Sequence, residues 1–134
     1  MNENWPHSRG VFVSHDKKFL IWVNEEDQLK VISMQEGADI QSVFQRLATA
    51  TGLIEKAFSF QKDEKLGYFT SCPSNLGTAL RASVHVHLPN LGQDKAKLKE
   101  LADKNALSVV GTFNSAEADV YDISNSRRLG VSEV

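Results

Sequence analysis

The sequence predicts an α+β fold, in which an antiparallel β-sheet is flanked by α-helices. Segment 11–34 contains short apolar runs, rich in β-branched and aromatic residues, separated by polar turns, which favours consecutive antiparallel strands. Segments 39–52 and 93–105 carry apolar residues at helical spacing. Segment 80–88 alternates strictly between apolar and polar residues, the pattern of a half-buried strand.

Length and composition indicate one ordinary globular domain over residues 1–134. The net charge of −2 gives no basic field, so we expect neither nucleic acid nor a membrane surface as a partner. The longest apolar run, 19–23, is too short to span a bilayer, and the N-terminus lacks a signal peptide, so we expect a cytoplasmic protein. One cysteine and four histidines offer no metal-ligand spacing, so no metal site is expected.

Each predicted element follows from a local pattern. Asp39 is a suitable N-cap for the first helix, and Gly52 closes its apolar pattern. Pro89 ends the alternating strand, and the second helix directs Leu98, Leu101 and Ala102 inward. The predicted strands are 11–13, 19–23, 29–34, 66–70, 80–88, 107–112 and 119–123, with loops at 59–65 and 114–118 and the first turn of a further helix at 132–133.

The alternating strand has one apolar face and one face equipped for chemistry. The sequence lacks both GxxxxGK[ST] and GxGxxG, so a bound nucleotide would have to be held by side chains. Arg81, Ser83 and His85 share a face and could present a guanidinium, a hydroxyl and an imidazole to phosphates. A solvated sheet face is the alternative interpretation. The opposite, apolar face comprises Leu80, Ala82, Val84, Val86 and Leu88.

Two further features have both a chemical and a structural interpretation. Glu25, Glu26 and Asp27 lie in one tight turn, where they could hold a cation or a planar guanidinium, or form a solvated hairpin tip. Cys72 precedes Pro73 at a strand end, where a thiolate could act beside a bound cation; a lone cysteine is also often a small buried hydrophobe.

Three runs, 19–27, 72–78 and 80–85, resemble the phosphagen kinases, the ATP:guanidino phosphotransferases that include arginine kinase and creatine kinase. The CPSNLGT run followed by RASVH is highly specific, and 31–35, 120–125 and 128–130 extend the likeness over nearly the whole chain. The resemblance implies the phosphagen kinase catalytic-domain fold and the C-terminal catalytic domain of such an enzyme, closest to arginine kinase. It also implies truncation at both ends, with the helical N-terminal domain absent.

The resemblance also implies the roles of individual residues. Glu26 would grip the guanidinium of the substrate and Cys72 would lie beside it, both as catalytic residues. ATP, with Mg²⁺ carried by the nucleotide, and a guanidine such as arginine would be the small-molecule partners, with ADP as product. The implied ATP-binding residues are Lys30, Arg81, Ala82, Ser83, Val84, His85, Asp122 and Arg128.

Departures from the family pattern reduce the expected activity. The family carries basic residues where Val110 and Phe113 stand, and Ser115 occupies the place of a guanidinium-binding carboxylate in a shortened loop. Lys30 replaces an arginine, which keeps the charge but loses the bidentate fork. We therefore expect weak or no activity from the chain alone. The alternatives are a non-catalytic nucleotide-binding or scaffold module, or a shortened or redesigned core of such a domain.

Overall fold

The computed structural model describes residues 6–111 and 119–130, which group into two compact units. The first unit comprises Met1–Asp63 and Tyr68–Pro73, and the second comprises Glu64–Gly67 and Ser74–Val134. The sequence pattern indicated one compact unit, whereas the packing forms two, so each is described by itself. The assignment of 1–134 to one family domain stays a prediction.

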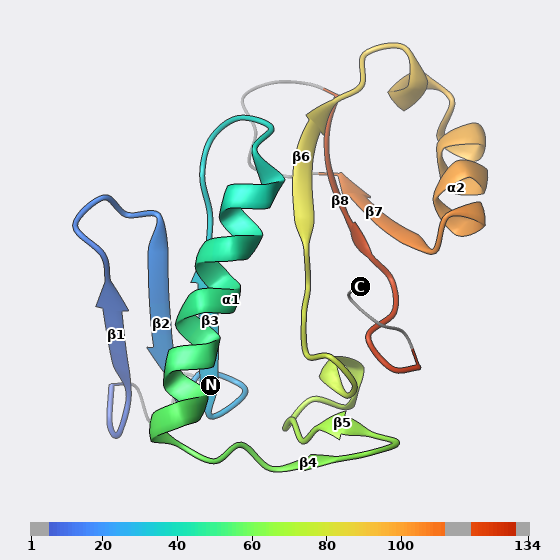
Figure 1. The fold of residues 1–134 in the computed structure, drawn as a ribbon. Helices are drawn as coiled ribbons and strands as arrows, with labels where there is room; N and C mark the ends of the chain where they lie inside the picture. The colour runs from blue at the N-terminus through green and yellow to red at the C-terminus, as the bar shows by residue number, and fades with distance from the viewer. Residues whose placement is uncertain (1–5, 112–118, 131–134) are drawn as a thin grey trace. The chain divides into compact units, whose positions relative to one another are not determined.

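The first unit contains a three-stranded antiparallel meander (Figure 1). Its strands are β1 (Gly10–Val13), β2 (Phe19–Val23) and β3 (Leu29–Ser33), in the order β1-β2-β3. The alternation of apolar runs with polar turns therefore predicted this sheet correctly, with boundaries shifted by one residue at β1 and β3. The register places Trp22 opposite Lys30, so the turn that joins β2 to β3 carries the acidic residues at its tip.

Helix α1 (Ile40–Ala57) begins where the sequence predicted and ends five residues later than predicted. The carboxylate of Asp39 caps the helix by accepting a 3.0 Å hydrogen bond from the Ser42 N–H. Hydrogen bonding from the side chain and backbone of Ser42 holds the pKa of Asp39 below its usual value. The helix continues through Gly52 because an interior glycine costs only about 1 kcal/mol relative to alanine.

Two short strands, β4 (Lys62–Asp63) and β5 (Gly67–Tyr68), lie where the chain passes between the units. The predicted strand at 66–70 is therefore too long, and β4 lies in a segment that we expected to be a loop. Gly67 explains the short strand, because its φ of +69° departs from extended geometry. Tyr68 is anchored within the first unit, where its hydroxyl donates a 2.8 Å hydrogen bond to Glu55.

The second unit is built on a three-stranded antiparallel sheet of order β6-β8-β7. Its strands are β6 (Ser83–His87), β7 (Leu107–Gly111) and β8 (Val120–Asn125), so the last strand in sequence lies between the other two. The predicted strand at 80–88 is shorter in the structure. The Asn125 side chain accepts a hydrogen bond from the Ala82 N–H (2.9 Å) and donates one to the Leu80 carbonyl (3.0 Å). The backbone just before β6 is therefore bound by this side chain.

Helix α2 (Lys95–Lys104) covers part of this unit and follows a 3₁₀ turn, Leu91–Gln93, where the sequence predicted the helix itself to begin. Asp94 caps α2 by accepting a 3.0 Å hydrogen bond from the Lys97 N–H. Leu98 and Ala102 are buried as predicted, whereas Leu101 is 41% exposed, so its inward assignment is wrong. One turn separates Leu98 from Ala102, and Leu101 lies off that buried line.

The structure confirms the α+β class with antiparallel sheets and flanking helices. Within 6–111 and 119–130, no helix combines the length and apolar character needed to cross a membrane. Several predictions fall outside the described residues: the end of the strand at 112, the loop 114–118 and the helical turn at 132–133.

Gly77 supplies a test of the second unit's packing. Its φ is +104°, and an added Cβ would collide with the Arg128 carbonyl group. We expect Gly77→Ala to lower the free energy of unfolding by about 3 kcal/mol, because backbone strain and overpacking add. Gly37→Ala is the matched control, because Gly37 has a φ of +93° with nothing within 4 Å; we expect a loss of about 1 kcal/mol. Urea denaturation followed by circular dichroism measures both, and equal losses would contradict the close packing at Gly77.

Candidate active site

The turn between β2 and β3 is fixed by hydrogen bonds at its base. The Asn24 N–H donates to the Gln28 carbonyl at 2.9 Å, and Asn24 has a φ of +55°, a conformation that asparagine tolerates better than most residues. The Asn24 side chain donates to the Ser8 carbonyl (2.7 Å), and Arg9 Nε donates to the Asn24 carbonyl (2.8 Å). Segment 7–9 therefore lies against the turn and holds it.

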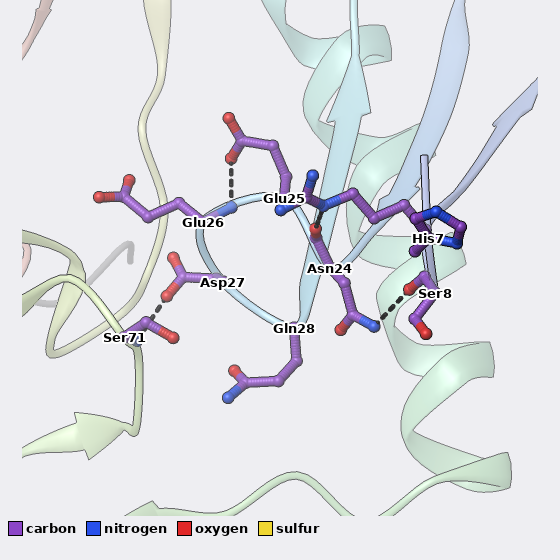
Figure 2. A pocket seen from close by; sticks show the side chains of 9 residues that line it. His7, Ser8, Asn24, Glu25, Glu26, Asp27, Gln28 and Ser71 are labelled. Atoms are coloured by element: carbon purple, nitrogen blue, oxygen red, sulfur yellow. Dashed lines mark hydrogen bonds between the residues drawn. The ribbon is translucent and has the colours of Figure 1, made fainter. Parts of the chain in front are cut away.

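The three carboxylates of this turn differ in their partners (Figure 2). Glu25 Oε2 accepts the Glu26 N–H at 2.9 Å and lies 3.5 Å from Lys30 Nζ. Asp27 Oδ1 accepts the Ser71 N–H at 2.5 Å. The carboxylate of Glu26 is exposed and makes no hydrogen bond or ion pair with any residue that the structure describes. Glu26 is thus the acidic group of the turn left free to bind a cation.

An open pocket of about 440 Å³ lies over this turn. Residues 24–28 line it together with segment 7–9 and Ser71. Acidic groups on the turn and the basic side chain of Arg9 therefore border the same hollow. Across 6–111 and 119–130, no group of three histidine, cysteine or acidic side chains is arranged to hold a metal ion. The arrangement suits an organic cation, because a carboxylate pairs with a planar guanidinium through two parallel hydrogen bonds.

Cys72 belongs to the same unit as the acidic turn. Cys72 is the only cysteine of the chain and is half-buried. Its N–H lies 3.4 Å from Asp27 Oδ1, and its carbonyl accepts a 2.8 Å hydrogen bond from the Thr70 hydroxyl. The structure therefore brings the backbone of Cys72 to the turn that carries Glu26, although the two residues are far apart in sequence.

A second polar group forms where β6 and β8 pair in the second unit. Arg81 Nη2 lies 2.6 Å from Asp122 Oδ2, and Arg81 Nη1 donates to the Ser83 hydroxyl at 3.3 Å. His85 is directly opposite Asp122 in the register. The structure thus gathers four of the residues singled out for ATP binding: Arg81, Ser83, His85 and Asp122.

Exposure corrects the predicted apolar face of this strand. Ala82 and Val84 are exposed, with Val84 at 36%, whereas Val86 is half-buried. The prediction that Ala82 and Val84 face a core is therefore wrong. Both exposed residues remain available to a ligand, because neither is covered by the described part of the unit.

Arg128 and Lys30 have partners outside the group around Asp122. Arg128 Nη1 donates to the Ser74 carbonyl, and the Arg128 carbonyl accepts from the Thr78 N–H, each at 3.0 Å. Arg128 thus holds the segment that follows Cys72, and its Nε is buried without a hydrogen-bond partner among the described residues. Lys30 belongs to the first unit, where it pairs with Glu25.

Sequence reasoning missed two residues that shape these groups. Asp27 was seen only as one of three acidic residues, yet it receives the N–H groups of Ser71 and Cys72. Asn125 fixes the backbone that leads into β6, although Ala82 is 43 residues away in sequence. No local pattern reveals either role, because the partners meet only when the chain folds.

Comparison with known proteins places these features in a family. The model of the ATP:guanido phosphotransferase C-terminal catalytic domain matches residues 1–134. Arginine kinase 1 of Drosophila melanogaster is 51% identical over 132 residues, and arginine kinase of Limulus polyphemus is 50% identical over 132 residues. Each alignment covers 96% of this chain and 37% of the relative.

Solved structures give the same result. A duplicated taurocyamine kinase from Schistosoma mansoni with bound transition state analog components matches with a TM-score of 0.91 and 43% identity, covering 98% of this chain and 19% of that chain. A crystal structure of lombricine kinase matches with a TM-score of 0.84 and 40% identity, covering 98% of this chain and 38% of that chain. The chain belongs to the ATP:guanido phosphotransferase family, the phosphagen kinases, and it is similar to arginine kinases. It spans 37% of the length of the curated relatives named above.

The ion pair between Arg81 and Asp122 can be measured by a double-mutant cycle. Because the charged groups of this pair are only 2.6 Å apart, we expect a coupling of about 1 kcal/mol between Arg81→Ala and Asp122→Ala. The Lys30–Glu25 pair, at 3.5 Å, is the control, and its coupling should be no more than about 0.5 kcal/mol. Urea unfolding of the single and double variants gives both values. A coupling near zero for Arg81 and Asp122 would contradict the expected stabilisation by this ion pair.

Proposed function

We propose that this chain provides the catalytic chemistry of an arginine kinase-like ATP:guanidino phosphotransferase, in which the γ-phosphoryl group of ATP passes to a guanidine such as arginine. One observation supports this proposal above the others: Glu26 presents an unpartnered carboxylate at an open pocket while its two acidic neighbours are engaged. Family membership and the similarity to arginine kinases agree with it.

The proposed reaction breaks the bond between the terminal phosphorus and its bridging oxygen and forms a bond from that phosphorus to a guanidine nitrogen. The guanidinium loses a proton, and ADP leaves. Glu26 would bind the guanidinium and aim the attacking nitrogen, and Cys72 would add a polarisable sulfur beside the same group. Alignment of the two substrates supplies much of the rate in phosphoryl transfer, so fixed side chains matter more than covalent chemistry.

The nucleotide would enter with Mg²⁺ as a substrate complex. Arg81 would bind the phosphates, because a guanidinium offers five N–H donors and its pairing with Asp122 and Ser83 leaves others for an anion. That pairing holds the side chain in place before the nucleotide arrives. The remaining proposed ATP-binding residues are Lys30, Ala82, Ser83, Val84, His85, Asp122 and Arg128.

Val110 is the reason to propose weak turnover. It lies on β7 opposite Asp122 and is 51% exposed, at a position where the resemblance to the family implies a basic residue. Loss of one charge that stabilises the transition state typically costs about 100-fold to 1000-fold in rate. The same observation favours the second candidate function, a non-catalytic module that still binds nucleotide.

Calorimetry with Mg²⁺–ATP tests the nucleotide half of the proposal. We expect binding by the unaltered chain and a loss of affinity of about tenfold or more in Arg81→Ala, because charge-assisted hydrogen bonds to phosphate are lost. Arg127→Ala is the control: it removes the same charge from a nearby exposed position and should change affinity by less than about twofold.

A coupled assay for ADP release with a panel of guanidines then separates the two candidate functions. Slow turnover with arginine would support the kinase, and binding without turnover at high protein concentration would support the non-catalytic module. Absence of nucleotide binding would contradict both.

A further inference from the structure

Asp27 connects the two parts of the proposed guanidine site. It follows Glu26 directly in the β2–β3 turn, and its Oδ1 accepts the N–H of Ser71 at 2.5 Å and approaches the N–H of Cys72 at 3.4 Å. Asp27 and Ser71 are 44 residues apart in sequence and belong to the same unit. Figure 2 shows the Asp27 carboxylate directed at the Ser71 backbone while the Glu26 side chain extends away from it.

The segment that Asp27 holds has little regular structure of its own. Residues 69–72 lie between β5 and a 3₁₀ turn that begins at Pro73 and belong to no strand, although the Phe69 N–H donates a 3.1 Å hydrogen bond to the Gln61 carbonyl. An ionised carboxylate is a strong acceptor for backbone N–H groups, roughly twice as strong as a neutral one. Asp27 therefore fixes the backbone just before the Cys72 side chain.

The anchor itself is held by hydrogen bonds within the β2–β3 turn. The turn that carries Asp27 is closed by the hydrogen bond from Asn24 to Gln28 and is braced by Glu25, which holds the Glu26 N–H. The hydrogen bond to Asp27 thus connects segment 69–72 to the turn between β2 and β3, and so to the sheet that contains these strands. Because Asp27 and Glu26 share one peptide bond, the same anchor sets the position of both.

We propose that Asp27 is a positioning residue, which fixes the Cys72 backbone relative to the turn bearing Glu26 so that thiol and carboxylate serve one guanidinium. This inference rests on the proposed function, because it assigns Glu26 and Cys72 to a common substrate. In this role Asp27 acts through the backbone N–H groups that it binds, although it also borders the pocket. Its acceptor oxygen is engaged by backbone N–H groups, which separates its role from that of Glu26.

Two measurements test the positioning role without any substrate. The first is the ¹H–¹⁵N spectrum, in which the Ser71 amide should shift markedly in Asp27→Asn, because it loses a charged acceptor. The second is the rate at which Ellman's reagent labels Cys72, the only thiol in the chain. We expect labelling to rise about fivefold in Asp27→Asn and further in Asp27→Ala, because a weakened or lost hydrogen bond loosens the segment.

Asp16→Asn is the matched control. Asp16 is also a turn carboxylate of the first unit and accepts hydrogen bonds from the Ser14 hydroxyl (2.6 Å) and the Lys18 N–H (3.1 Å), but it is part of neither site. It should leave the Ser71 amide and the labelling rate unchanged. Equal labelling of Asp27→Asn and Asp16→Asn, or an unmoved Ser71 amide, would overturn the proposal. Unfolding of Asp27→Asn, detected by circular dichroism, would also overturn it, because Asp27 would then support the fold as a whole.

Protection of Cys72 by arginine with Mg²⁺–ADP distinguishes failure of this inference from failure of the proposed function. Protection in the unaltered chain that is lost in Asp27→Asn supports both. Absence of protection in the unaltered chain counts against the proposed guanidine site, while the amide shift and the labelling rates still decide whether Asp27 positions the segment. Full protection retained in Asp27→Asn would contradict the positioning role and leave the proposed function intact.

Discussion

The register of β8 is the constraint on which the second unit depends. This strand pairs with β6 on one side and β7 on the other, so Asp122 lies opposite His85 and also opposite Val110. A slip of one residue would turn Asp122 to the other face of the sheet and remove it from Arg81. The positions of His85 and Asp122 therefore follow from backbone pairing, and Asp122 in turn pairs with Arg81.

In the first unit, partners rather than residue types distinguish the acidic groups. Three carboxylates follow one another in the β2–β3 turn, yet Glu25 is occupied by Lys30 and a neighbouring N–H, and Asp27 by a distant backbone segment. The exposed carboxylate of Glu26 stays hydrated, so it loses no hydrogen bonds by lacking a protein partner. A chain can thus keep one acidic group ready for a ligand while its neighbours hold the fold.

The sequence predicted those features that depend on neighbours along the chain. The β2 boundaries and the Asp39 cap follow from local patterns, and so does the buried pair of Leu98 and Ala102. Features set by distant partners were missed. Where the β6 strand was expected to begin, the Asn125 side chain forms hydrogen bonds with the backbone of Leu80 and Ala82. Asp27 binds a segment that no spacing rule connects to it. Exposure of Val84 was missed as well, because alternation gives two faces without saying what covers either.

Cross-strand nuclear Overhauser effects across β6, β8 and β7 test the central claim most directly. The account predicts backbone contacts that pair His85 with Asp122 and Asp122 with Val110, each observed in the free chain. Contacts that pair His85 with Tyr121 or Ile123 instead would contradict it, because the charged groups of the second unit would then lie on opposite faces of the sheet.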